Sequence, residues 1–165
     1  MKKSLTLCLA LCACGLGARA QAETGYDLWL RYVPVEDQGQ RRAYRRAVPA
    51  MVVPGSSPTT RVIRDELGRG LRGLLGGETA AWDEVRGVVG TPSRSPLVAG
   101  LGWAEPLARL GDDGYLIRST RLGGHPAIVI ASQGERGALY GVFHFLRLIQ
   151  TGREVSSLDV AQRPR

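Results

Sequence analysis

The segment from Pro126 to Gln150 restricts the fold more than any other part of the sequence. It opens with Ala127-Ile128-Val129-Ile130, a run without a polar residue. A strand that is apolar at consecutive positions is buried on both faces, as in the interior of an α/β sheet. A helix is predicted directly after it, over Glu135–Gln150, ended by Thr151-Gly152. Its apolar stripe consists of Leu139, Val142, Phe143, Leu146 and Ile149.

A second long helix is predicted after Ser57, which is a suitable N-cap. Pro58 fits the first helical position, where the missing N–H is not needed, and Gly76-Gly77 ends the helix. Gly68, Gly70 and Gly73 weaken it but allow a neighbouring element to approach closely. One apolar face is formed by Ile63, Leu67, Leu71, Leu74 and Leu75.

The remaining segments alternate between strands and helices. Pro49 places its strand near a sheet edge, and residues 121–124 join two strands into a hairpin. This order predicts one α/β domain of two layers, a mixed β-sheet packed by helices. The other predicted strands are Tyr26–Tyr32, Val48–Val53, Glu84–Val89, Tyr115–Thr120, Pro126–Ala131 and Val155–Val160, and the other helices are short ones at Arg41–Arg46, Ser95–Leu101 and Ala104–Leu110.

The first twenty residues are typical of a secretory signal peptide rather than of the domain. Lys2 and Lys3 precede the apolar run Leu5–Leu16, and Ala18-Arg19-Ala20 is a small-x-small cleavage site. The run is too short to span a membrane. We expect cleavage after Ala20, with Ala22 as an alternative, so that residues 21–165 form an exported domain.

The three cysteines, Cys8, Cys12 and Cys14, all lie within this leader. The processed domain therefore has no disulfide and no cysteine-based metal site. Leu11-Cys12-Ala13-Cys14 also resembles a lipoprotein box, which leaves lipidation of Cys14 as a second interpretation.

Charge gives little support for a nucleic-acid partner. The chain has 22 basic and 15 acidic residues, and loss of Lys2, Lys3 and Arg19 lowers its net charge from +7 to +4. An exported protein rarely meets nucleic acid, so a solvated face is the favoured role for the basic cluster. That cluster is Arg41, Arg42, Arg45 and Arg46 around Tyr44.

The sequence does not support a nucleotide-binding site, a metal site or a serine-hydrolase site. Gly68-x-Gly70-x-x-Gly73 spells the dinucleotide fingerprint, but it falls inside a predicted helix instead of at a strand-to-helix turn. His125, in a predicted turn, and His144, on a predicted helix, have no metal-ligand spacing. No GxSxG elbow occurs.

Glycoside hydrolysis needs two opposed carboxyl groups, and the sequence does not define such a pair. Asp27 is the most notable acid, because Trp29 and Arg31 share its face of the predicted strand and could bind a sugar or a neighbouring domain. No catalytic residue is assigned. The other candidate acids are Asp83, Glu84, Glu105, Asp112, Asp113, Glu135 and Glu154.

Five segments, in order, resemble the N-terminal domain of glycoside hydrolase family 67, the bacterial xylan α-glucuronidases. They cover nearly all of the processed chain, whereas the loop from Pro34 to Arg46 matches no family pattern. The segments are Gly25–Tyr32; Ser57-Pro58 with Glu66–Gly76; Gly90-Thr91-Pro92-x-x-Ser95-Pro96 with Leu101-Gly102-Trp103; Leu110–Arg118; and Leu139–Gly152.

The resemblance implies an α/β domain similar to the one that precedes the barrel in β-hexosaminidases. Family members continue into a TIM barrel that carries the catalytic carboxylates, and they remove (4-O-methyl-)glucuronic acid from xylo-oligosaccharides with inversion, without a cofactor. That barrel is the expected partner, and a homo-oligomer of the full enzyme stays open. The alternative is a stand-alone exported carbohydrate-binding or accessory domain, with Trp29, Trp82 or Trp103 as an aromatic platform.

Overall fold

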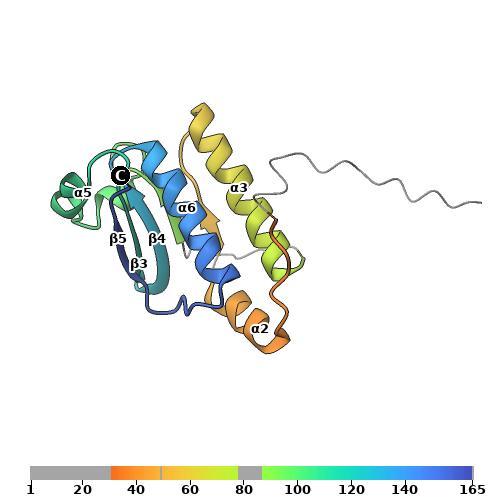
Figure 1. Cartoon of the computed structure of the whole chain (residues 1–165). Helices are drawn as coiled ribbons and strands as arrows, with labels where there is room; N and C mark the ends of the chain where they lie inside the picture. The colour runs from red at the N-terminus through yellow and green to blue at the C-terminus, as the bar shows by residue number, and fades with distance from the viewer. Residues whose placement is uncertain (1–30, 49, 78–86, 165) are drawn as a thin grey trace, which may run out of the picture. The chain divides into compact units, whose positions relative to one another are not determined.

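The computed structural model describes residues 31–48, 50–77 and 87–164. Every element below belongs to one unit, Tyr32–Arg165, and carries its label in Figure 1. Five strands of the described part form one sheet in the order β1-β2-β4-β3-β5. They are β1 Met51–Val52, β2 Gly87–Gly90, β3 Tyr115–Leu122, β4 His125–Ser132 and β5 Asp159–Gln162.

The sheet is mixed, as the sequence predicts. β1, β2 and β4 run parallel, whereas β3 is antiparallel to both of its neighbours, β4 and β5. The central strand β4 is the continuous apolar run, and Ala127 to Ala131 are all buried. The short β1 is an edge strand, in agreement with the position of Pro49 in the sequence.

The β3–β4 hairpin closes through two glycines. Gly123 and Gly124 have φ angles of +56° and +87°, and Leu122 pairs directly with His125. Two consecutive residues with positive φ match the strand twist of a tight hairpin, and glycine adopts this conformation without strain. The predicted four-residue connection is therefore a two-residue turn.

Three helices cover one face of the sheet, α2 Gln38–Ala47, α3 Pro58–Leu75 and α6 Glu135–Gln150. Figure 1 shows α3 and α6 side by side in front of the strands. Their apolar stripes meet Ile117, Ile128 and Ile130 from the sheet in the larger core cluster. The two-layer α/β prediction is thus confirmed.

Two shorter helices, α4 Pro96–Ala99 and α5 Ala104–Leu110, pack on the other face. Val98 of α4 and Leu107 of α5 join Val88, Leu116 and Val129 in a second apolar cluster. The alternation of side chains along each strand separates the two clusters.

The ends of the long helices agree with the sequence signals. Ser57 caps α3 by accepting a hydrogen bond from the Thr60 N–H at 3.0 Å, and α3 stops at Gly76. Gly70 lies against α6, where an added Cβ would stand 2.5 Å from Leu146 Cδ1. The fingerprint glycines therefore belong to a helix interior and to helix packing.

Several predicted boundaries were wrong. The last strand is Asp159–Gln162 rather than Val155–Val160, because Val155 and Leu158 point into the core from a loop. Val48 follows α2 as its C-cap instead of starting a strand. The predicted strand Tyr26–Tyr32 and the start of the strand at Glu84 lie largely outside the described residues.

In the part of the chain that the structure describes, no helix combines the length and the apolar character that crossing a membrane requires.

Candidate functional site

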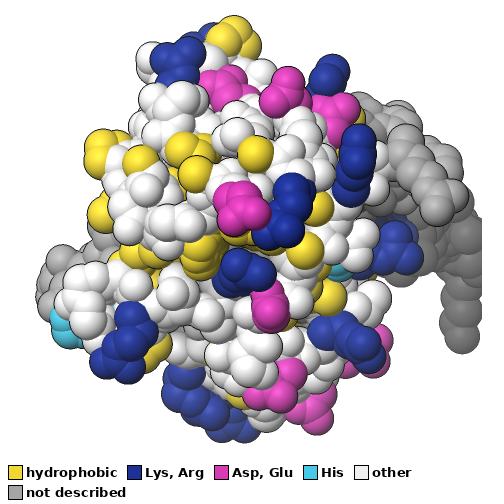
Figure 2. Space-filling view, turned by 90° about the vertical axis from the view of Figure 1, so that its left-hand side faces the viewer, with side chains coloured by type: hydrophobic (Ala, Val, Ile, Leu, Met, Phe, Trp, Pro, Cys, Tyr) yellow, Lys and Arg dark blue, Asp and Glu magenta, His cyan; other side chains and the backbone are white. Residues whose placement is uncertain are grey.

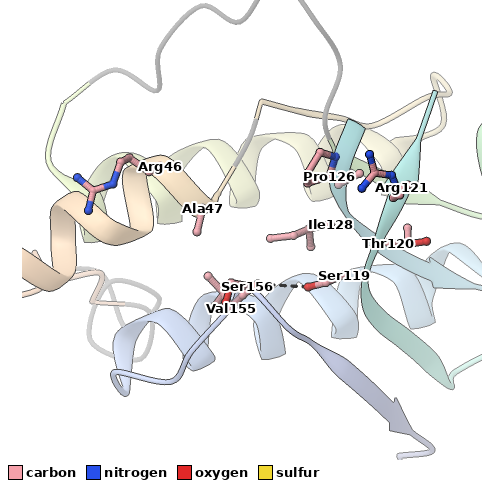
Figure 3. A pocket seen from close by; sticks show the side chains of 10 residues that line it. Arg46, Ala47, Ser119, Thr120, Arg121, Pro126, Ile128, Val155 and Ser156 are labelled. Carbon is pink, nitrogen blue, oxygen red and sulfur yellow. Dashed lines mark hydrogen bonds between the residues drawn. The ribbon is translucent and has the colours of Figure 1, made fainter. Parts of the chain in front are cut away.

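A cavity lies beside the β3–β4 hairpin, and we call it the hairpin pocket. Its volume is about 500 Å³, within the range of small-ligand sites. It lies between the end of α2, the two hairpin strands and the loop before β5 (Figure 3). Its lining residues are Arg46, Ala47, Ser119, Thr120, Arg121, Pro126, Ala127, Ile128, Val155 and Ser156.

Ser119 holds the walls of the pocket together. Its Oγ accepts a hydrogen bond from the Leu158 N–H at 2.9 Å and donates one to the Val155 carbonyl at 3.4 Å, drawn as the dashed line in Figure 3. The Ser119 N–H also donates to the Leu158 carbonyl at 2.9 Å. A loop without regular structure is thereby fixed to β3.

The pocket is basic and has an apolar base. Arg46 and Arg121 contribute two guanidinium groups, and the lining contains no carboxylate. In Figure 3, Ala47 and Ile128 face the space between the walls, whereas the Arg46 guanidinium is turned outward at the rim. Arg121 donates a hydrogen bond to the Gly124 carbonyl of the turn.

A second polar cluster lies where the carboxyl ends of β1, β2 and β4 meet, the edge at which α/β sheets commonly bind ligands. Ser57 Oγ donates to Glu135 Oε2 at 2.6 Å, and Arg94 Nε stands 3.8 Å from Glu135 Oε1. Ser57 caps α3 and Glu135 lies in the first turn of α6. The cluster therefore ties two helix N-termini together and holds a single carboxylate.

Most of the predicted site residues lie outside the described part of the chain. Cys14, Ala20, Asp27 and Trp29 belong to residues 1–30, so their roles stay predictions. Arg31 is described, is exposed, and is not part of a strand in the structure.

Trp103 does not form an open platform. It is partly buried against the second apolar cluster, and the guanidinium carbon of Arg118 lies 5.3 Å from its ring centroid. Trp82 lies outside the described residues, as Trp29 does.

Three of the other described candidate acids make local contacts. Asp113 pairs with Arg136 at 2.5 Å, Glu105 with Arg109 at 3.4 Å, and Glu154 accepts from Ser156. None of these acids lines the hairpin pocket. Within the described residues, no group of three or more His, Cys, Asp or Glu side chains could hold a metal ion.

His144 has a local partner. Its Nδ1 is 3.0 Å from Tyr115 Oη, and the two rings meet edge to face. Burial, with a smaller contribution from the Arg147 guanidinium, lowers the pKa of His144 below its usual value of 6.5. Burial also raises the pKa of Tyr115. His125, predicted in the turn, is instead the first residue of β4.

Comparison with known families decides the relationship. Residues 28–145 match the family described as "Glycosyl hydrolase family 67 N-terminus". The chain belongs to this family. As a family 67 N-terminal domain, it is 32% identical over 162 residues to alpha-glucuronidase A of Emericella nidulans and 30% identical over 141 residues to the alpha-glucuronidase of Hypocrea jecorina.

These matches cover most of this chain but little of the relatives. The Emericella nidulans match includes 90% of this chain and 18% of the relative, and the Hypocrea jecorina match 79% and 16%. The family 67 N-terminal domain thus corresponds to less than a fifth of each relative's length. The larger part of those enzymes has no counterpart in the 165 residues.

The fold also occurs in a solved structure, a family GH115 4-O-methyl-alpha-glucuronidase with specificity for decorated arabinogalactans. The two chains superpose with a TM-score of 0.52 at 19% identity, over 70% of this chain and 17% of the other. At this identity the likeness concerns the fold alone, and it agrees with the predicted α/β class.

The hairpin pocket was not predicted from the sequence. Its residues come from four separate stretches, at 46–47, 119–121, 126–128 and 155–156, and no local spacing joins them. The nearest signal is the pair Arg45-Arg46 at the end of a basic cluster, which on a helix indicates only a charged face.

Proposed function

We propose that this chain is the non-catalytic N-terminal domain of an exported α-glucuronidase that removes (4-O-methyl-)glucuronic acid from xylo-oligosaccharides. The observation that carries the proposal is the in-order match of 90% of the chain to the first part of enzymes about five times longer. The leader Met1–Ala20 supports export.

The described site residues support a role outside the chemistry. Hydrolysis of a glycoside needs an acid and a second carboxylate, between about 5 and 9.5 Å apart across the sugar. The hairpin pocket is lined by cations and hydroxyls instead, and the edge cluster contributes one carboxylate, which is held by Ser57 and Arg94. The acids of the reaction are therefore assigned to the catalytic region that the relatives carry.

The intact mass of the native polypeptide tests the proposal. A mass several times the 17.8 kDa of the chain, together with release of glucuronic acid from aldouronic acids, is the expected result. A native species slightly lighter than 17.8 kDa would contradict it and favour a stand-alone accessory domain. Turnover by the separately expressed 165-residue chain would contradict the non-catalytic role.

A further inference from the structure

The hairpin pocket combines features that suit one class of small ligand. Its volume of about 500 Å³ accommodates a monosaccharide or a disaccharide. Pro126 and Ala47 supply accessible apolar surface against which the C–H face of a sugar ring can pack, above the buried side chains of Ile128 and Val155. Because these residues come from α2, β4 and a loop pinned by Ser119, the cavity is built by the fold rather than by one mobile segment.

The positive charge of the pocket favours an anionic ligand. Within the described residues, no hydrogen bond or ion pair engages the Arg46 guanidinium, and Arg121 is bonded only to the Gly124 carbonyl. A guanidinium offers five N–H donors in a planar fork that matches a carboxylate. Both arginines therefore keep donors free for an anion, and no acidic residue in the lining competes for them.

One hydroxyl group of the lining is available to the rest of a sugar. The Thr120 side chain is turned away from the pocket in Figure 3, on the face of β3 opposite to Ser119, so Thr120 contributes only its backbone to the lining. Ser156 Oγ lies on the opposite wall, where it donates to Glu154, and its oxygen can still accept. The Ser156 hydroxyl can thus bind one hydroxyl of a pyranose while the ring packs on Pro126 and Ala47.

We propose that the hairpin pocket is a binding site for a uronic acid, with its carboxylate on Arg121 and with Arg46 swinging inward from the rim to close on it. The choice of a uronic acid among carboxylates rests on the proposed function.

Titration of the ¹⁵N-labelled 165-residue chain with sodium glucuronate tests the site directly. We expect saturable shifts with a dissociation constant of about 1 mM, typical of a few polar contacts to one sugar. Glucose, which lacks the carboxylate, should bind at least about tenfold more weakly, because the loss of the charged partner leaves only the neutral contacts. The amides expected to shift are those of Ser119, Thr120, Ala127, Ile128 and Ser156.

Two variants and one control separate binding from folding. Arg121→Gln and Arg46→Gln should each weaken glucuronate binding several-fold, and they lie on different elements, so a folding defect in one does not remove the test. Arg109→Gln removes the same charge from α5, where Arg109 is exposed and pairs with Glu105, and should bind as the wild type does.

Three outcomes would contradict the proposed binding of a uronic acid. They are no saturable shifts with glucuronate, equal binding of glucose, and equal binding of inorganic phosphate with no preference for the sugar. None of them depends on the catalytic region. A native enzyme of the expected mass that releases glucuronic acid would leave the proposed function standing even where this binding fails.

Discussion

Gly70 decides how closely the two long helices approach each other. Its missing side chain leaves room for Leu146, which is fully buried and cannot move aside. Gly68, two residues earlier, would meet only the Arg72 guanidinium at 3.1 Å, the flexible end of an exposed side chain. The same substitution at the two positions therefore has opposite consequences.

We expect Gly70→Ala to destabilise the domain and Gly68→Ala to stabilise it. Alanine gains up to about 1 kcal/mol of helix propensity at either site. At position 70 this gain is exceeded by overpacking, which costs about 1–3 kcal/mol. Urea unfolding of the two variants beside the wild type measures both effects, and shifts of the same sign would contradict this account of Gly70.

His144 makes the stability depend on pH. Its pKa is lowered in the folded chain, by burial first and by Arg147 second, so the unfolded chain binds the proton more tightly. The contribution to stability is complete above the unfolded pKa of 6.5 and is lost as the pH falls through that value toward the lower folded pKa.

We therefore expect the free energy of unfolding to decrease between about pH 7.5 and pH 5, the range in which histidine changes charge. His144→Gln should make this dependence shallower, because the titrating group is absent. Denaturant unfolding at several pH values measures the slope. An unchanged slope in the variant would show that other groups cause the dependence.

Among the elements, α2 shows best what a sequence pattern leaves out. Only a short helix at Arg41–Arg46 was predicted, but α2 runs from Gln38 to Ala47. Its start is set locally by Asp37, whose side chain accepts a hydrogen bond from the Gln40 N–H at 2.6 Å, whereas tertiary contacts hold its second half. Arg45 donates to the carbonyls of Leu75 and Gly76 at the end of α3, and Tyr44 Oη donates to the Arg153 carbonyl at 2.7 Å. Arg42, Arg45 and Arg46 are thus exposed, as the prediction of a solvated face requires, but Tyr44 is buried and Arg45 also holds the end of α3.

We expect Arg45→Ala to destabilise the domain by about 1–2 kcal/mol, because hydrogen bonds from a charged donor to the α3 carbonyls are lost. Arg46→Ala, one position further on, removes an equal charge and should change stability little, because no contact in the described residues holds Arg46. Thermal unfolding of both variants tests this difference. Equal destabilisation would mean that charge or helix propensity, rather than the carbonyl contacts, matters.

The elements that sequence reasoning located well are those with a local signal at both ends. α3 has the Ser57-Pro58 start and the Gly76 stop, and α6 runs over Glu135–Gln150 as predicted. The last strand was misplaced because Val155 and Leu158 are apolar core residues that lie in a loop rather than in a strand. The hairpin pocket could not be predicted, because its walls come together only through tertiary packing.

At the scale of the whole molecule, the proposed function requires a surface that contacts the rest of an α-glucuronidase. Four large apolar side chains of the described residues are clearly exposed, Val33, Val62, Leu97 and Tyr140. Val62 lies on α3 and Tyr140 on α6. Val33 lies in a segment that is held beside the end of α3 by the hydrogen bond from the Val35 N–H to the Leu74 carbonyl. Leu97, the fourth of them, lies on the opposite face, in α4.

From the proposed function we expect Val62→Asn to lower the thermal stability of the native full-length enzyme and to change that of the separate 165-residue chain much less, because the rest of the enzyme would cover the exposed Val62. Leu97→Asn is the matched control on the other face. Figure 2 shows the side of the molecule that carries α5, where apolar side chains lie in a hollow between charges of both signs. If Leu97→Asn lowered the thermal stability of the enzyme more than Val62→Asn, the contact with the rest of the enzyme would lie on the α4 and α5 face instead.

The attachment of α2 has a mechanical consequence. Gln40 and Tyr44 bind the carbonyls of Gly152 and Arg153 after α6, and Arg45 binds those at the end of α3, so one short helix brackets the ends of two long ones. A force that pulls on the N-terminal side of the chain loads these α2 contacts before it loads any described strand of the sheet. The domain should therefore yield under tension in two stages, with the release of α2 first and the rupture of the sheet at a higher load.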